Sequence, residues 1–78
     1  MPSYNTKHIR AVLKSLGLHP LKGKAEGHEF WGNDQGRTCR PRLHSREIAL
    51  AHVFSLGHEL EAQGICSRTA FLQAVKGR

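Results

Sequence analysis

The chain has few cysteines, few aromatic residues and no long apolar run, and these scarcities exclude several classes of protein. Only two cysteines, Cys39 and Cys66, occur in 78 residues, and they do not form a Cys-x-x-Cys pair. We therefore expect neither a disulfide-rich scaffold nor a thiolate zinc module, and we expect both cysteines to be small buried hydrophobic residues. No stretch approaches the roughly 18 apolar residues of a membrane span or the pattern of a signal peptide. We expect a reduced, cytoplasmic protein without membrane association.

Acidic residues are also scarce, which gives the chain a strongly basic balance. Twelve Lys and Arg outnumber 6 Asp and Glu, so the formal net charge is +6 and the pI is about 10.0. This balance favours a polyanionic partner, with nucleic acid first, an acidic protein second and an anionic membrane last. The chain has 6 histidines, so its positive charge should rise, and nucleic-acid binding tighten, as the pH falls through about 6.5.

Helical periodicity is clearest in residues 6–16, whose apolar residues fall on one face. These apolar residues are Ile9, Val12, Leu13 and Leu16. Asn5 or Thr6 can cap the start of this helix, and Gly17 can end it. Three cations share the opposite face, which is either an ordinary solvated face or a surface that follows phosphates. These cations are Lys7, Arg10 and Lys14.

The middle of the chain has strand patterns. Pro20 restricts a first strand, around 18–22, to a short edge strand, because proline cannot donate to a sheet ladder. Two further strands, about 28–32 and 37–42, flank the turn Asn33-Asp34-Gln35-Gly36, whose residues tolerate the positive φ of a hairpin loop. One face of the last strand carries Thr38, Arg40 and Arg42. This face is either a basic row that binds a ligand or an ordinary solvated strand face.

Two helices are expected after Ser45, which can act as an N-cap. Residues 46–63 have helical spacing, and their buried side is predicted to carry Leu50, Val53, Phe54 and Leu60. Gly57 weakens this helix by roughly 1 kcal/mol relative to Ala, unless close packing needs a missing side chain. A last helix, 68–75, lies in a C-terminal helical tail of about 64–78. Its predicted buried residues are Phe71, Leu72 and Val75, with Cys66 packed on the first of them.

These elements predict one small α+β domain that covers residues 1–78. A chain of this length with 38% hydrophobic residues can bury one thin core but not two. The expected order is α-β-β-β-α(-α), in two layers, with a small antiparallel three-stranded sheet packed on the helices. This order on a basic chain resembles the double-stranded-RNA-binding-domain fold, abbreviated dsRBD.

Short motifs along the chain carry a further resemblance. In chain order they are Gly17-Leu18, His28 with Trp31, Gly36-Arg37, Pro41 and His44-Ser45-Arg46-Glu47-Ile48. This series resembles the HicA toxins of bacterial toxin–antitoxin pairs, and Gln63-Gly64-Ile65 followed by Phe71-Leu72 is similar to the ending of longer members. The chain departs from the family at Glu26-Gly27, where members have Gly-Ser before the histidine.

The resemblance implies a single HicA-like domain that cleaves mRNA as a metal-independent endoribonuclease without a cofactor. His28 matches the family's essential histidine, and a cognate HicB-like antitoxin is the implied protein partner. Cleavage within RNA deprotonates a 2′-hydroxyl, and a positioned imidazole acting as general base contributes roughly 10² to 10⁴ in rate. Candidates for the proton donor are His44 and Lys24. Candidates to stabilise charge on the phosphate are Lys24, Arg37, Arg40 and Arg42.

The predicted RNA-binding set combines the cations of the first helix with residues of the hairpin. Its members are Lys7, Arg10, Lys14, Lys24, Phe30, Arg37, Arg40, Arg42 and His44. Strand parity requires that His28 and Phe30 share one face while Glu29 and Trp31 share the other. In the register that suits a nuclease, Trp31 faces the helices and Phe30 is free to stack on a base. The other register buries Phe30 and draws His28 against the core, and a bulge would blur the difference.

Two alternatives remain open beside the nuclease hypothesis. The second hypothesis is a non-catalytic RNA- or DNA-binding module of the same fold. The third is a protein-interaction module, for which the C-terminal helices would form a homodimer or bind another protein. No metal site is predicted, because His44, His52 and His58 lack the i, i+4 spacing of a helical zinc pair.

Overall fold

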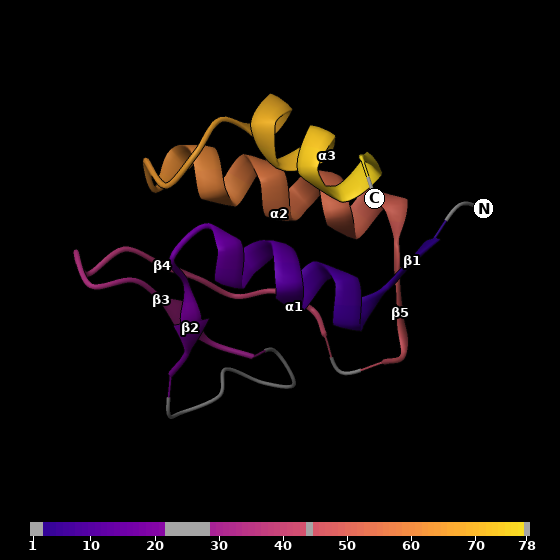
Figure 1. Ribbon diagram of the computed structural model, residues 1–78, viewed down its shortest axis with the longest axis horizontal. Coiled ribbons are helices and arrows are strands. Elements are labelled where there is room, and N and C mark those ends of the chain that lie inside the picture. Colours follow the sequence, from indigo (N-terminus) through magenta and orange to yellow (C-terminus); the bar gives the residue numbers. More distant parts are fainter. Residues whose placement is uncertain (1–2, 22–28, 44, 78) are drawn as a thin grey trace.

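The computed structural model describes residues 3–21, 29–43 and 45–77. The elements in these ranges are β1 (Ser3–Asn5), α1 (Thr6–Ser15), β2 (His19–Pro20), β3 (Trp31–Gly32), β4 (Thr38–Cys39), β5 (Glu47–Ala49), α2 (Leu50–Ala62) and α3 (Arg68–Lys76). Figure 1 shows α2 and α3 stacked on one side of α1, with β2, β3 and β4 near one end of α1 and β1 and β5 near the other. The predicted α+β class, with helices and a three-stranded antiparallel sheet, is confirmed.

The first helix forms where its periodicity predicted it. The side chain of Asn5 accepts a hydrogen bond from the backbone N–H of Lys7 at 2.8 Å, which caps α1. Gly17 follows the helix with a φ of 86°, a left-handed conformation that suits glycine. The apolar face is buried in the core through Ile9, Val12 and Leu13.

The three-stranded sheet has the order β2-β3-β4, so β2 is an edge strand, as Pro20 requires. Trp31 pairs with Cys39 across β3 and β4, and the turn between them is closed by the side chain of Asn33. The regular strands are shorter than the predicted 28–32 and 37–42. The amide of Glu29 still donates to the carbonyl of Pro41 at 3.2 Å, but the regular ladder ends there because Pro41 has no N–H to return a bond.

A second, two-stranded sheet was not predicted. β1 pairs with β5 antiparallel, with Tyr4 opposite Ile48, so residues 47–49 are extended where a helix was expected. The prediction that Ser45 caps a helix 46–63 is therefore wrong, because α2 begins at Leu50. The reason is long-range pairing: burial of Ile48 and the ladder to β1 favour an extended chain over local helical spacing.

The two C-terminal helices pack on each other and on α1. In α2 the buried stripe consists of Val53, Leu56, Gly57 and Leu60. Phe54 was expected on this side and is instead 42% exposed, because it lies about 100° around the helix from Val53. In α3, Phe71 and Val75 are buried as predicted, and Leu72 is half-buried. Among the described residues, every helix is too short or too polar to cross a bilayer.

The core joins both sheets to the three helices. Its buried apolar residues are Ile9, Val12, Leu13, Leu18, Trp31, Cys39, Leu43, Ile48, Val53, Leu56, Leu60, Phe71 and Val75. Burial, with smaller effects from Glu59 and Cys66, raises the pKa of the Cys39 thiol to about 12. Cys39 therefore stays a neutral thiol at physiological pH, as expected of a small buried hydrophobic residue.

Gly57 gives a direct test of helix–helix packing in this core. A Cβ at this position would lie 3.4 Å from both Arg68 Cβ and Phe71 Cδ2, which leaves room for a methyl group and nothing larger. We expect Gly57→Ala to raise the free energy of unfolding by roughly 0.5–1 kcal/mol through helix propensity. Gly57→Leu should lower it by more than about 1 kcal/mol through overpacking. Urea denaturation followed by circular dichroism measures both, and equal destabilisation by the two variants would contradict this packing.

Candidate nucleic-acid interface

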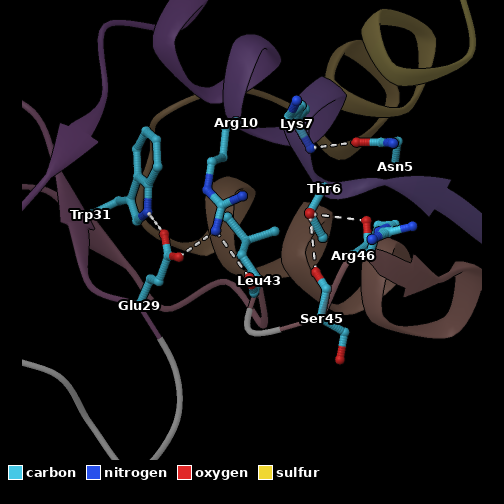
Figure 2. Close-up of polar contacts among 9 residues, drawn as sticks. All are labelled: Asn5, Thr6, Lys7, Arg10, Glu29, Trp31, Leu43, Ser45 and Arg46. Atoms are coloured by element: carbon cyan, nitrogen blue, oxygen red, sulfur yellow. Dashed lines mark hydrogen bonds and ion pairs between the residues drawn. The ribbon is translucent and has the colours of Figure 1, made fainter.

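The carboxylate of Glu29 joins the hairpin to α1. One of its oxygens accepts a hydrogen bond from the indole N–H of Trp31 at 2.9 Å, and the other accepts from Arg10 Nη2 at 2.5 Å. Arg10 Nη2 also donates to the backbone carbonyl of Leu43 at 3.0 Å. Figure 2 shows Arg10 reaching from α1 into this arrangement, beside the ring of Trp31. The three contacts fix which side of the hairpin faces the helix.

The side chains of Glu29 and Trp31 therefore lie toward α1, as strand parity requires of residues two positions apart. Trp31 is only 1% exposed, which is the burial expected in the nuclease register. Phe30 is half-buried and lines a small pocket with Pro20 and Leu21. Three predicted site residues lie outside the described residues: His28, Lys24 and His44.

A groove runs between the N-terminal turn of α1 and the segment before β5. We call it the α1 groove, and its lining residues are Asn5, Thr6, Lys7, Arg10, Leu43, Ser45 and Arg46. Its volume is about 520 Å³. Thr6 closes its floor, since its hydroxyl donates to the carbonyls of Ser45 and Arg46, each at 3.0 Å. Figure 2 places this part of the groove on the far side of Arg10 from Trp31.

The cations along α1 differ in how they are engaged. Lys7 and Lys14 are exposed, and among the described residues neither ammonium has an ion-pair or hydrogen-bond partner. Lys14 lies in the last turn of α1, where its positive charge interacts favourably with the negative end of the helix dipole. Arg10 is different, because Glu29 neutralises its charge within the fold. Arg10 thus has a structural role whether or not it also contacts RNA.

The segment after the hairpin turn has a clear alternation of burial. Cys39, Pro41 and Leu43 are buried, whereas Arg40 and Arg42 are exposed and Thr38 is half-buried. Thr38, Arg40 and Arg42 were predicted to share one face of this segment, and the alternation agrees with that prediction. Within the described ranges, the guanidinium groups of Arg40 and Arg42 contact no acid. They form a basic row open to solvent.

Arg37 is engaged differently from its neighbours in the predicted set. Its guanidinium donates to the backbone carbonyl of Gln63, just beyond the end of α2. The same guanidinium lies against Gly64, which has a φ of 73° and no side chain to obstruct it. Arg37 therefore ties the hairpin turn to the connection between α2 and α3.

Two residues of the candidate interface were missed by the sequence analysis. Arg46 was placed inside a helix, so its position beside α1 was not foreseen. Glu29 was noted only for strand parity, and its bridging role depends on contacts with residues 10 and 31 that no local pattern reveals. An acid two positions before a tryptophan on a strand does place both on one face, which is the only sequence signal for this contact.

We expect removal of the Glu29 carboxylate to destabilise the fold. Glu29→Ala leaves the indole N–H of Trp31 and the guanidinium of Arg10 without their acceptor, which should lower the free energy of unfolding by about 2 kcal/mol. Glu29→Gln should cost less, roughly 1 kcal/mol, because the amide can still accept from Trp31 and the half-buried ion pair is partly screened by solvent. Glu47→Ala, which removes an exposed acceptor for Ser3, is the control. Urea denaturation followed by tryptophan fluorescence distinguishes them, and equal effects of Glu29→Ala and Glu47→Ala would contradict the bridge.

The chemistry of the site must be argued from its residues, because the comparisons with known proteins give no relative. No protein-family model matches the chain, and no curated protein or solved structure matches it. In the described part of the chain, no three histidine, cysteine or acidic side chains gather closely enough to hold a metal ion. The arrangement there consists of exposed cations around a folded hairpin, which is suited to binding a polyanion.

Proposed function

We propose that the protein is an endoribonuclease toxin of the HicA type, with a dsRBD-like fold, that binds mRNA and cleaves it with His28 as general base. The observation that carries the proposal is the register of the hairpin. Glu29 and Trp31 face α1, so an extended strand would direct residues 28 and 30 to the other side. An imidazole at residue 28 would then be accessible to RNA.

Binding of the RNA backbone is attributed to the exposed cations. Arg40 and Arg42 form a row on one face of an extended segment, and Lys7 and Lys14 are exposed on α1. Guanidinium groups suit phosphates because their planar N–H donors can bind two oxygens at once. Phe30 is half-buried, and its ring is the proposed stacking partner of a base.

The proposed reaction needs no metal ion. His28 would take the proton of a ribose 2′-hydroxyl, and the resulting oxygen would attack the adjacent phosphate. Negative charge grows on the phosphate oxygens during this attack, and nearby cations would stabilise it. The candidates for that role are Lys24, Arg40 and Arg42. Arg37 was also predicted, but its guanidinium donates to the carbonyl of Gln63. Protonation of the leaving 5′-oxygen is attributed to His44 or Lys24.

A HicB-like antitoxin is proposed as the protein partner, and cytoplasm as the compartment in which both meet mRNA. An antitoxin that covers a basic surface would supply acidic or extended contacts to it. The exposed row of Arg40 and Arg42 is the surface that such contacts would neutralise. Antitoxin and RNA would then compete for the same cations, which explains how binding alone could silence the enzyme.

The catalytic proposal is tested with His28→Ala. We expect this variant to lose RNA cleavage by 10² or more, as removal of a general base requires, and to relieve growth arrest on expression. His52→Ala is a matched control, because His52 is an exposed histidine on α2 without a partner among the described residues. Both variants should keep the circular dichroism of the unmodified protein. Cleavage retained by His28→Ala, or a harmless wild type that leaves RNA intact, would contradict the nuclease proposal.

A non-catalytic RNA-binding module is the second candidate, favoured by the same exposed arginines. In either case, the double variant Arg40→Ala/Arg42→Ala should bind RNA more weakly and reduce the slope of log affinity against log salt by about 1.4. Lys76→Ala, which removes an exposed cation at the end of α3, should change neither. Fluorescence anisotropy at several salt concentrations measures both quantities. Unchanged affinity and slope in the double variant would exclude the arginine row from RNA binding.

A further inference from the structure

We infer that the α1 groove is a binding site for one phosphate group, held between the side chains of Lys7 and Arg46. The inference rests on the proposed function only in naming RNA as the source of that phosphate. It adds Arg46 to the binding residues and places a contact in a groove whose lining does not include Arg40 or Arg42.

The charges around the groove favour an anion. Lys7 and Arg46 are exposed, and neither charged group is paired with an acid among the described residues. Arg10 also lines the groove, but Glu29 neutralises it. Glu47 follows Arg46 in sequence, and its carboxylate accepts a hydrogen bond from the Ser3 hydroxyl at 3.0 Å. Among the described residues, the lining therefore has two uncompensated positive charges and no acidic side chain.

The backbone segments that carry the two cations are tied together through Thr6. The backbone N–H of Thr6 donates to the carbonyl of Arg46 at 2.9 Å, and the Thr6 hydroxyl donates to the same carbonyl. Thr6 is 3% exposed, so water does not compete strongly for these bonds. Lys7 is the next residue along α1. Its side chain and that of Arg46 therefore extend from backbone atoms that are tied together before any ligand arrives, which reduces the entropy lost on binding.

The backbone at the start of α1 contributes little to the site. The N–H of Lys7 is capped by Asn5, and the N–H of Thr6 is bonded to Arg46. A phosphate in the groove would depend on the side chains of Lys7 and Arg46, with the exposed hydroxyl of Ser45 as a further donor. Replacing the two cations should consequently abolish the site without unfolding the helix.

The test uses the full chain with His28→Ala as background, so that RNA is not cleaved during titration. Lys7→Ala/Arg46→Ala is compared with Lys76→Ala. The first arm titrates inorganic phosphate and follows backbone amide shifts by NMR. The second arm measures the affinity of a short single-stranded RNA at several salt concentrations. We expect phosphate to shift the amides of residues 5–7 and 45–46 in the background protein and not in the double variant.

In the RNA arm, loss of two phosphate-binding cations should reduce the salt slope by about 1.4 and the affinity on the order of tenfold near 0.1 M salt. Unchanged affinity and slope would overturn the groove as an RNA subsite, even if free phosphate shifts its amides. Absence of amide shifts in the groove, with unchanged RNA binding, would overturn the phosphate site altogether. If the background protein binds no RNA, the proposed function fails, and the phosphate titration alone supports or overturns the anion site.

Discussion

The carboxylate of Glu29 is the contact on which the geometry of the candidate interface depends. It accepts from Trp31 of β3 and from Arg10 of α1, while Arg10 also holds the carbonyl of Leu43. One half-buried anion thus fixes the hairpin, the helix and the following segment relative to one another. These contacts determine which hairpin side chains face α1. The side chains on the opposite face of the hairpin are available for a ligand.

Glu29 also lowers the electrostatic repulsion within this basic chain. Neutralising Arg10 inside the fold removes the repulsion that the cations of α1 would otherwise exert on it. Lys7, Lys14, Arg40, Arg42 and Arg46 have no acidic partner within the part of the chain that the structure describes, and all are exposed. Arg10 therefore stabilises the fold, and the proposed RNA binding depends on the exposed cations that have no acidic partner.

Local signals predicted the helical parts of the fold. The boundaries of α1 and α3 follow from apolar periodicity with caps at Asn5 and Ser67, and the hairpin turn follows from Asn33 and Gly36. These features depend on residues within a few positions of each other. They also indicated a weak point, with a kink or break, at Gly57, whereas α2 continues through this residue without a break.

Long-range contacts explain what the sequence did not reveal. The β1–β5 ladder depends on residues more than 40 positions apart, and its formation moves the start of α2 to Leu50. Arg46 consequently enters the groove rather than a helix. The two histidines expected to act in catalysis, His28 and His44, lie outside the described ranges. The proposal of a nuclease is therefore based on the hairpin register and on the resemblance to HicA toxins.

The β1–β5 ladder also bears on the order of events during synthesis. Thr6 forms its hydrogen bonds with residues 45 and 46, so α1 is synthesised well before the residues to which it is bonded. At roughly 5–20 residues per second, that interval lasts a few seconds. Until β5 emerges, the start of α1 has neither its ladder nor the facing wall of its groove. A nascent chain halted before β5 would accordingly lack the ladder that positions the second wall of the α1 groove.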